Sequence, residues 1–359
     1  MTSRERFLAC MNYQPVDRVP LRPTFGAWPE TLERWANEGS NEPNAPTFQT
    51  DQWDWFGGWF FPNPPFEREV VEEDAETILY INKEGILMRE LKNHPHSSMP
   101  QFVRFPVQTR DDFRRFWKER MNPDIAARVG ADWKEKLSAY RERDVPLIII
   151  ADRWGGFFGP IRNMTGVEHL CTLFYDEPAL VEEMMDATAD FIIAMMDQIL
   201  DVTDIDVFGF WEDMAYKTAS LLSPEMARKY MLPRYRRVVD FVRSRGVELI
   251  SLDSDGDVSD LIPVWLDAGI NVLYPFEAQA GMDVLEVRKE YGRDLRMWYG
   301  VDKRVLASGK EAIDAELERI RPLVEDGGYV PGTDHSLPPD VSYENYCYYM
   351  ERFLDIYGS

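Results

Sequence analysis

From Val145 onward, the sequence alternates short apolar segments with amphipathic helical ones, and this rhythm constrains the fold more than any other feature. Six segments have the character of strands that end in polar or glycine residues, at 145–154, 206–213, 247–256, 270–277, 295–302 and 327–335. Helical stretches are expected between them at about 178–201, 223–245, 258–268, 283–291 and 310–326. Repeated strand–helix units with apolar strands indicate a parallel sheet.

The number of strands favours a closed barrel over an open sheet. Two further strands are expected near 18–25 and 77–91, which makes about eight, and no Gly-rich dinucleotide loop follows the first strand. We therefore predict an α/β fold, a single (β/α)8 TIM-barrel domain over residues 1–359. Residues 1–145 are irregular in pattern, and we expect an insert within them to cap the barrel mouth.

The expected insert contains an aromatic and proline-rich stretch, WDWFGGWFFPNPPFE at 53–67. Such aromatic residues belong to a core more often than to a ligand-binding cage. As part of a lid they would instead wall off an apolar or aromatic substrate. The residues concerned are Trp53, Trp55, Trp59, Phe60 and Phe61.

The overall charge limits the classes of partner. The net charge is −23 and the isoelectric point about 4.6, so nucleic acid and acidic membrane surfaces are not expected to bind. The first residues lack the apolar core of a signal peptide, and no run of about 18 apolar residues is found. The three cysteines, Cys10, Cys171 and Cys347, are not a disulfide framework. We expect a cytoplasmic protein.

Ionisable residues stand at every expected strand end, where (β/α) barrels place their active sites. These positions hold Asp152 and Arg153, Glu212 and Asp213, Asp253 and Asp255, Glu277, Asp302, and Asp334 and His335. We expect His335, Asp253, Asp255 and Glu212 to be catalytic. Substrate binding is assigned to Asp213, Tyr216, Lys217, Arg153 and Trp211. The other three histidines, His94, His96 and His169, are expected to be peripheral.

Four of these residues form a possible metal site. Asp253 and Asp255 lie on the same side of an extended segment, Glu277 follows 24 residues after Asp253, and His335 ends the last strand. Three carboxylates and an imidazole suit a divalent metal harder than one held by thiolates. Two alternatives stay open, namely that Asp255 only caps a turn and that Glu277 pairs with a barrel Arg or Lys.

Several segments together resemble the uroporphyrinogen decarboxylase superfamily, which includes corrinoid-linked methyltransferases. They cover nearly the whole chain, and their order and spacing carry the resemblance. They are SRERFLACMNYQPVDRVP, GPIRNMTGVEHLCTLFYDEPALVEEMM, WEDMAYKTASLLSPEMARKYMLPRY, SLDSDG, WLDAGINVLYPFEAQAGMD, YGVDKRVLASGK and GGYVPGTDHSLPPDVSYENY. The resemblance implies the (β/α)8 barrel.

Within that family, two enzyme functions can be compared residue by residue. The decarboxylase is similar to this chain at His335, in the H-x-L-x-P context, but it grips its polyanionic substrate with a clustered RQAGR pattern. This chain has Arg22 and Arg34 without that cluster. The methyltransferase branch holds zinc with His-x-Cys, Glu and Cys, and here those positions match Asp253-x-Asp255, Glu277 and His335. Glu277 is retained and the thiolates are replaced, so a divalent metal, zinc in the relatives, is possible.

The resemblance therefore implies a methyltransferase that moves a methyl group from a methoxylated or methylated small molecule to a corrinoid protein. The corrinoid would sit on a separate partner protein, because the chain lacks the D-x-H-x-x-G motif that holds it. One alternative is a decarboxylase or lyase of the uroporphyrinogen decarboxylase type acting on a carboxylate, with His335 and Asp253 as the acid–base pair. Another is a non-catalytic binding protein on an enzyme fold.

Overall fold

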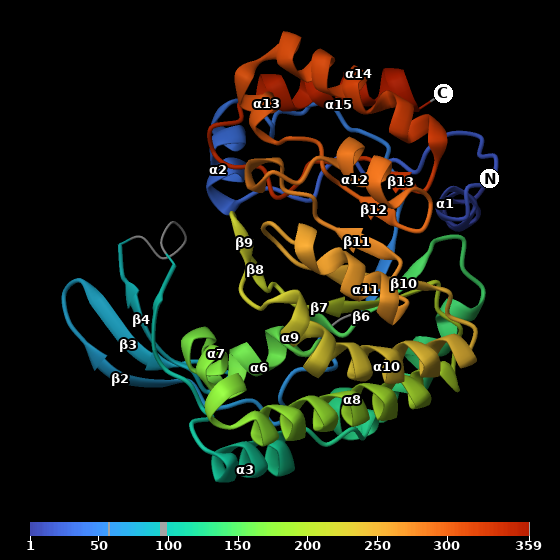
Figure 1. The fold of residues 1–359 in the computed structure, drawn as a ribbon. Coiled ribbons are helices and arrows are strands. Elements are labelled where there is room, and N and C mark those ends of the chain that lie inside the picture. Colours follow the sequence, from blue (N-terminus) through green and yellow to red (C-terminus); the bar gives the residue numbers. More distant parts are fainter. Residues whose placement is uncertain (57, 94–98, 359) are drawn as a thin grey trace.

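A seven-stranded, curled parallel sheet forms the centre of the molecule (Figure 1). The structure is a computed structural model, and it describes residues 1–56, 58–93 and 99–358. Neighbouring strands run in the order β1-β6-β7-β10-β11-β12-β13. Their bounds are Asp54–Phe56, Leu147–Ile150, Val207–Trp211, Leu249–Asp253, Val272–Tyr274, Arg296–Trp298 and Tyr329–Val330. The six strands predicted after Val145 are thus confirmed as parallel neighbours.

The eighth position is filled by an irregular segment. The Leu21 carbonyl oxygen accepts a hydrogen bond from Asp51 N (3.0 Å), just before β1, and the Pro23 carbonyl oxygen accepts one from Thr333 N (3.0 Å), just after β13. This segment joins the two edges of the sheet without forming a regular strand, so only seven ladder-bonded strands are described where eight were predicted. The segment near 18–25 takes the expected place in the barrel, but the strand predicted there is not formed.

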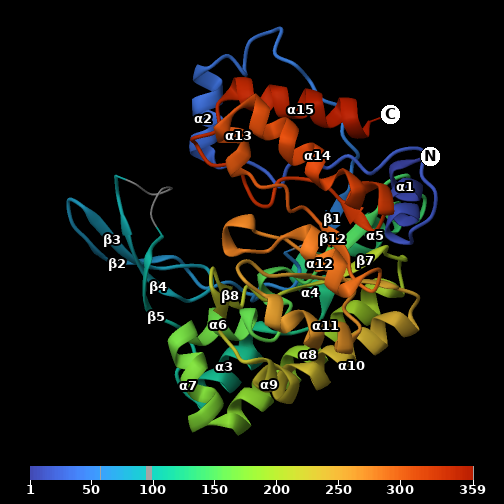
Figure 2. The ribbon, with the colours of Figure 1, turned by 45° about the horizontal axis from the view of Figure 1, so that its top comes forward.

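The second early segment, predicted near 77–91, does form strands, but its assignment to the barrel was wrong. Residues 77–91 lie in a separate antiparallel sheet of order β2-β3-β4-β5, and the barrel strand is β1, inside the aromatic stretch. The antiparallel strands are Glu69–Glu73, Thr77–Ile81, Leu87–Leu91 and Gln101–Arg104. Both ribbon views show this sheet standing off from the body (Figure 1, Figure 2). Trp53 and Phe60 are buried in the core, as expected for most such residues, whereas Trp55 is 38% exposed.

Helices cover the outside of the curled sheet (Figure 2). Helices α8 (Pro178–Leu200), α11 (Ile262–Ala268), α12 (Val284–Tyr291) and α14 (Lys310–Asp326) match the predicted stretches closely, and the stretch at 223–245 divides into α9 (Pro224–Met226), a π-helical turn (Ala227–Met231) and α10 (Leu232–Ser244). The remaining helices are α1 (Ser3–Met11), α2 (Pro29–Asn37), α3 (Arg110–Arg120), α4 (Ile125–Val129), α5 (Trp133–Ser138), α6 (Gly159–Thr165), α7 (Val167–Asp176), α13 (Arg304–Ser308) and α15 (Tyr343–Tyr357). A small hairpin, β8 (Ala215–Tyr216) with β9 (Ala219–Ser220), follows β7.

Among the residues described, no helix is both long and apolar enough to cross a membrane.

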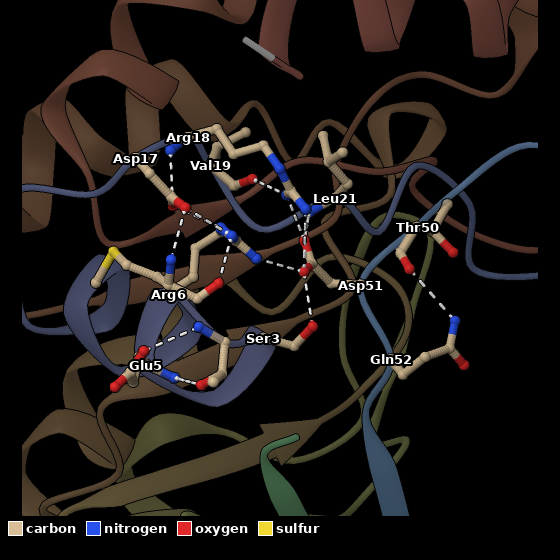
Figure 3. Close-up of polar contacts among 12 residues, drawn as sticks. Ser3, Glu5, Arg6, Asp17, Arg18, Val19, Leu21, Thr50, Asp51 and Gln52 are labelled. Carbon is tan, nitrogen blue, oxygen red and sulfur yellow. Dashed lines mark hydrogen bonds and ion pairs between the residues drawn. The ribbon is translucent and has the colours of Figure 1, made fainter. Parts of the chain in front are cut away.

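A buried carboxylate ties the N-terminal end of β1 to α1 (Figure 3). Asp51, with its side chain 2% exposed, accepts hydrogen bonds from Arg6 (2.7 Å), Arg18 (2.6 Å), Ser3 (2.8 Å) and the Leu21 amide (2.7 Å). Burial acts to raise the pKa of Asp51, but these donors outweigh it and hold the pKa below its ordinary value. The network lies at the end of the sheet opposite the active-site end of such barrels, so its role is stability.

We predict that Asp51→Asn lowers the free energy of unfolding by about 3–5 kcal/mol, because it leaves buried guanidinium charge uncompensated. Urea unfolding at pH 7 measures this. Because the folded pKa is depressed, the contribution of Asp51 is present above its unfolded pKa of about 4 and is lost as the pH falls below it. Asp204, whose side chain is 62% exposed and pairs with Arg4, provides the control. Asp204→Asn should cost at most about 1 kcal/mol, and equal costs for the two variants would contradict the assignment.

Candidate functional site

The loops after β10 and β13 bring Asp255 and His335 together. The Nε2 atom of His335 lies 3.6 Å from Oδ2 of Asp255, and both side chains are partly exposed. On its other side the imidazole stacks on Phe25, with ring centroids 5.0 Å apart and planes inclined by 19°. The two residues are 80 positions apart in sequence and meet because the carboxyl ends of parallel strands share one face of the sheet. This part of the predicted cluster is assembled as expected.

The environment favours the protonated form of His335. Burial alone lowers the pKa of the imidazole, but the hydrogen bond and charge of Asp255 more than offset this, and the pKa is raised above its ordinary value. Nearby Lys303 lowers the pKa and Glu277 raises it. A histidine with a raised pKa that is partly exposed at a barrel mouth can act as a proton donor near neutral pH.

We predict that Asp255→Asn lowers the pKa of His335, because the burial term then acts without the carboxylate that opposes it. NMR titration of the imidazole protons measures the change, and the His335→Ala spectrum identifies the signal among the four histidines. Asp257→Asn is the matched control, since Asp257 bonds to Ser259 in its own turn. An unchanged His335 pKa in Asp255→Asn would show that the pair does not interact in solution.

Glu277 belongs to a second group, centred on a lysine that the sequence analysis did not select. The Nζ atom of Lys303 lies 3.5 Å from Oε1 of Glu277 and 3.6 Å from Oδ1 of Asp334. The other oxygen of Glu277 accepts a hydrogen bond from the Gly256 amide (3.0 Å), next to Asp255. Of the two interpretations left open for Glu277, pairing with a barrel lysine is therefore the one that the structure shows.

Asp334 anchors this group in the interior. It is 1% exposed and accepts hydrogen bonds from the backbone amides of Lys303 (3.0 Å) and Ala278 (3.0 Å). Burial raises the pKa of Asp334, while the charge of Lys303 and the two amides oppose that shift. Asp334 and Lys303 thus link the ends of β11, β12 and β13, directly beside His335.

The side chains do not fit a resident divalent metal. Among the described residues, no three His, Cys, Asp or Glu side chains form a group that could hold a metal ion. The imidazole Nε2 of His335 is directed at Asp255, and Glu277 is bonded to the Lys303 ammonium and the Gly256 amide. The protein therefore already provides a partner for each carboxylate, His335 for Asp255 and Lys303 for Glu277. The predicted set of Asp253, Asp255, Glu277 and His335 is not gathered into one donor set.

Asp253 lies on the other side of the site, near Tyr299. Its backbone carbonyl accepts a hydrogen bond from the Glu212 amide (2.9 Å) at the end of β7. Burial raises the pKa of Tyr299, the positive charge of the nearby Arg22 guanidinium lowers it, and the negative charge of Asp253 raises it further. Tyr299 also packs edge-on against Phe25, with centroids 5.0 Å apart. Tyr299 therefore contacts Phe25 and lies near the charges of both Arg22 and Asp253.

The structure corrects the expectation that Glu212 is catalytic. Its side chain is 0% exposed and accepts hydrogen bonds from the amides of Phe157 (2.7 Å), Phe158 (2.6 Å) and Gly159 (3.0 Å), and from the Tyr235 hydroxyl. Burial raises the pKa of Glu212, and these donors oppose the shift. With both oxygens engaged and no surface, Glu212 fixes the turn that leads into α6 instead of meeting a substrate.

The residues expected to bind substrate lie at different places around the mouth. Asp213, with a left-handed φ of 46°, pairs with Arg162 at 2.7 Å. The guanidinium groups of Arg162 and Arg153 lie over the Trp211 ring, at 5.1 and 5.5 Å from its centroid. Arg153 also lines a largely apolar cavity of about 580 Å³ between α2 and the antiparallel sheet. These contacts form a separate part of the rim.

The hairpin residues Tyr216 and Lys217 are both exposed, at the edge of the same face. His169 lies on α7, outside the site, and His94 and His96 lie outside the described residues. Lys303, Phe25 and Arg22 were not among the residues predicted for the site. Lys303 directly follows the strand-end Asp302. Because it is a cation among strand-end acids, the sequence could have indicated it as their ion-pair partner in the site.

A curled parallel sheet with an ionisable cluster at its carboxyl ends defines a barrel-type protein with an enzyme-like site. Residues 155–353 match the uroporphyrinogen decarboxylase (URO-D) family, and the chain belongs to this family. No curated protein sequence gave a significant match.

Among solved structures, a methyltransferase from Methanosarcina mazei is similar over 99% of this chain and 98% of that chain, with a TM-score of 0.61 and 17% identity. A B12-independent methionine synthase from Shewanella sp. W3-18-1 covers 81% of this chain and 74% of that chain, with a TM-score of 0.41 and 8% identity. The first likeness supports the fold, and the second is too distant to support an argument.

Proposed function

We propose that the protein is a methyltransferase that transfers a methyl group from a methoxylated or methylated small molecule to a corrinoid carried by a partner protein. The observation that supports this most directly is the His335–Asp255 pair at the barrel mouth, 3.6 Å apart. Loss of a methyl group from oxygen or nitrogen leaves an electron pair on that heteroatom, and a protonated imidazole can supply the proton that neutralises it.

In this scheme each group of the chain has one task. His335 donates its proton to the departing oxygen or nitrogen, and Asp255 holds the imidazole in place and favours its charged form. The Lys303–Glu277–Asp334 group fixes the loops that carry both residues. The partner's corrinoid would supply the electron pair that accepts the methyl group. The methyl group leaves without its bonding electrons. The heteroatom keeps that electron pair and takes the imidazolium proton, which gives a neutral alcohol or amine and a neutral imidazole, so all atoms and charge are accounted for.

The test is a transfer assay with the purified chain, a reduced corrinoid protein and a panel of methoxyaromatics and methylamines. We expect one class of donor to lose its methyl group only when the chain and the corrinoid protein are both present. Failure to bind a corrinoid protein, together with no transfer from any donor, would overturn the proposal.

A second candidate is a carboxy-lyase of the kind that names the family. The family match and the guanidinium of Arg22 behind Phe25, which suits a carboxylate, favour it. Carbon dioxide release in the absence of any corrinoid protein would distinguish it from methyl transfer.

A further inference from the structure

The N-terminal segment that contains Phe25 runs beside the loop that contains His335, and hydrogen bonds join the two on either side of the histidine. Before His335, the buried Thr333 hydroxyl accepts a hydrogen bond from the Phe25 amide (3.1 Å). After it, the Leu337 amide donates a hydrogen bond to the Gly26 carbonyl oxygen (2.8 Å). Because the loop is bonded to one segment at both of its ends, the backbone holds Phe25 in a fixed register with His335.

The ring of Phe25 uses this register to lie flat against the imidazole. The two ring centroids are 5.0 Å apart and the planes are inclined by only 19°, which is an offset stack. From another side, Tyr299 meets the Phe25 ring at 69° with centroids 5.0 Å apart, and Tyr299 is 3% exposed. Phe25 is therefore braced between a buried aromatic ring and the partly exposed histidine.

The stack supplies a constraint that Asp255 does not. Asp255 contacts one atom of the imidazole, with Oδ2 at 3.6 Å from Nε2 of His335. In the protonated ring the second N–H donor is on Nδ1. Rotation about the bond between Cβ and Cγ of a histidine has only broad minima, so a single polar contact leaves the plane of the ring loosely defined. A flat neighbour restricts that rotation and so determines where the Nδ1–H bond points.

We propose that Phe25 is a positioning residue, which fixes the plane of the His335 imidazole and thereby directs its Nδ1–H bond toward the substrate. The fixed plane itself does not depend on the reaction, whereas its use in proton transfer rests on the proposed function. A proton donor must lie within hydrogen-bond reach of the atom that it protonates, and a displacement of about 1 Å can lower a rate by about a hundredfold.

NMR of the imidazole protons tests the stack without any methyl donor or corrinoid protein. An aromatic ring stacked on the imidazole moves its carbon-bound proton signals upfield, and the His335→Ala spectrum identifies these signals. We expect upfield signals in the wild type and in Phe25→Tyr, which keeps the ring, and their return to ordinary positions in Phe25→Leu. Phe25 lines a cavity of about 570 Å³, which gives room for the added hydroxyl. Phe48→Leu is the matched control, because Phe48 packs against Tyr346, with centroids 6.1 Å apart.

The titration of His335 provides a second measurement on the same proteins. A cation over the face of an aromatic ring is attracted to it, so loss of the Phe25 ring should lower the pKa of His335 by about 0.5 to 1. The charged groups that face the imidazole are Asp255, Lys303 and Glu277, and these are unchanged in Phe25→Leu. Phe25→Tyr and Phe48→Leu should titrate as the wild type.

The methyl-transfer assay separates positioning from direct contact with the substrate. Phe25→Leu should lower kcat by about tenfold to a hundredfold with little change in KM, because the misdirected proton donor acts only when the bond to the methyl group breaks. Phe25→Tyr should recover most of the lost turnover. A raised KM with an unchanged kcat would show that Phe25 contacts the substrate, and would overturn the positioning role.

Phe25→Met, which also lacks a ring, replaces Phe25→Leu in these measurements should the latter unfold in circular dichroism. Unchanged His335 signals in a folded variant without the ring, or an equal change in Phe48→Leu, would overturn the proposal. If no donor is turned over by the wild type, the proposed function fails while the NMR results still decide whether Phe25 fixes the imidazole.

Discussion

His335→Ala is expected to lower the rate of methyl transfer by a factor of about 100 to 10,000, the usual contribution of a positioned general acid. The expected loss is large because no other described histidine lies near the mouth to take over the proton transfer. Turnover of the demethylated product at saturating donor measures the effect. KM should change less than kcat, because His335 acts when the bond to the methyl group breaks.

The chain offers a matched control for that experiment. His169, on α7, is the same residue type outside the site, and His169→Ala should keep wild-type turnover. The Asp255→Asn variant should lose part of the activity at pH 7 and regain some of it at lower pH, where the imidazole is again protonated. Wild-type turnover in a His335→Ala, Asp255→Ala double variant would instead show that this pair does not carry the reaction.

The half of the fold after Val145 could be predicted because its signals are local. Each strand is a short apolar run, and most helices have a stop signal close by, such as the left-handed Gly269 after α11. The structure of the half before Val145 is determined by tertiary contacts instead. Strand β1 has three residues within an aromatic stretch, and the segment at the eighth position bonds to both edges without regular strand geometry. Periodicity gives no indication of either.

The site was predictable as far as strand order determines it. Asp255 and His335 meet because parallel strands end on one face, which the sequence pattern already implied. The direction of a side chain is not implied, and this explains the error with Glu212. An acid after a buried strand has the same sequence pattern whether it faces the mouth or, as here, turns inward to bond the amides before α6.

The second large effect is expected from Lys303→Met. This change leaves Glu277 and Asp334 without the ammonium that lies 3.5 and 3.6 Å from them, in a region where Asp334 is 1% exposed. Removing one partner of a buried ion pair costs about 3–5 kcal/mol of unfolding free energy. Two nearby carboxylates without a cation also attract one, since oxygen donors at such a site suit Mn²⁺ or Mg²⁺. Lys303→Met should therefore be less stable and should gain affinity for Mn²⁺.

The wild type and three variants separate these effects. Calorimetric titration with MnCl2 should detect no binding to the wild type and measurable binding to Lys303→Met, and Mn²⁺ should restore part of the lost stability in urea. Glu277→Gln added to Lys303→Met should abolish the gained Mn²⁺ affinity, because one of the two carboxylates is then neutral. Lys217→Met, at an exposed hairpin position, should leave stability and metal binding unchanged. One tightly held equivalent of zinc in the purified wild type, measured by mass spectrometry, would show that these side chains rearrange around a resident metal and that the Lys303 ammonium does not take its place.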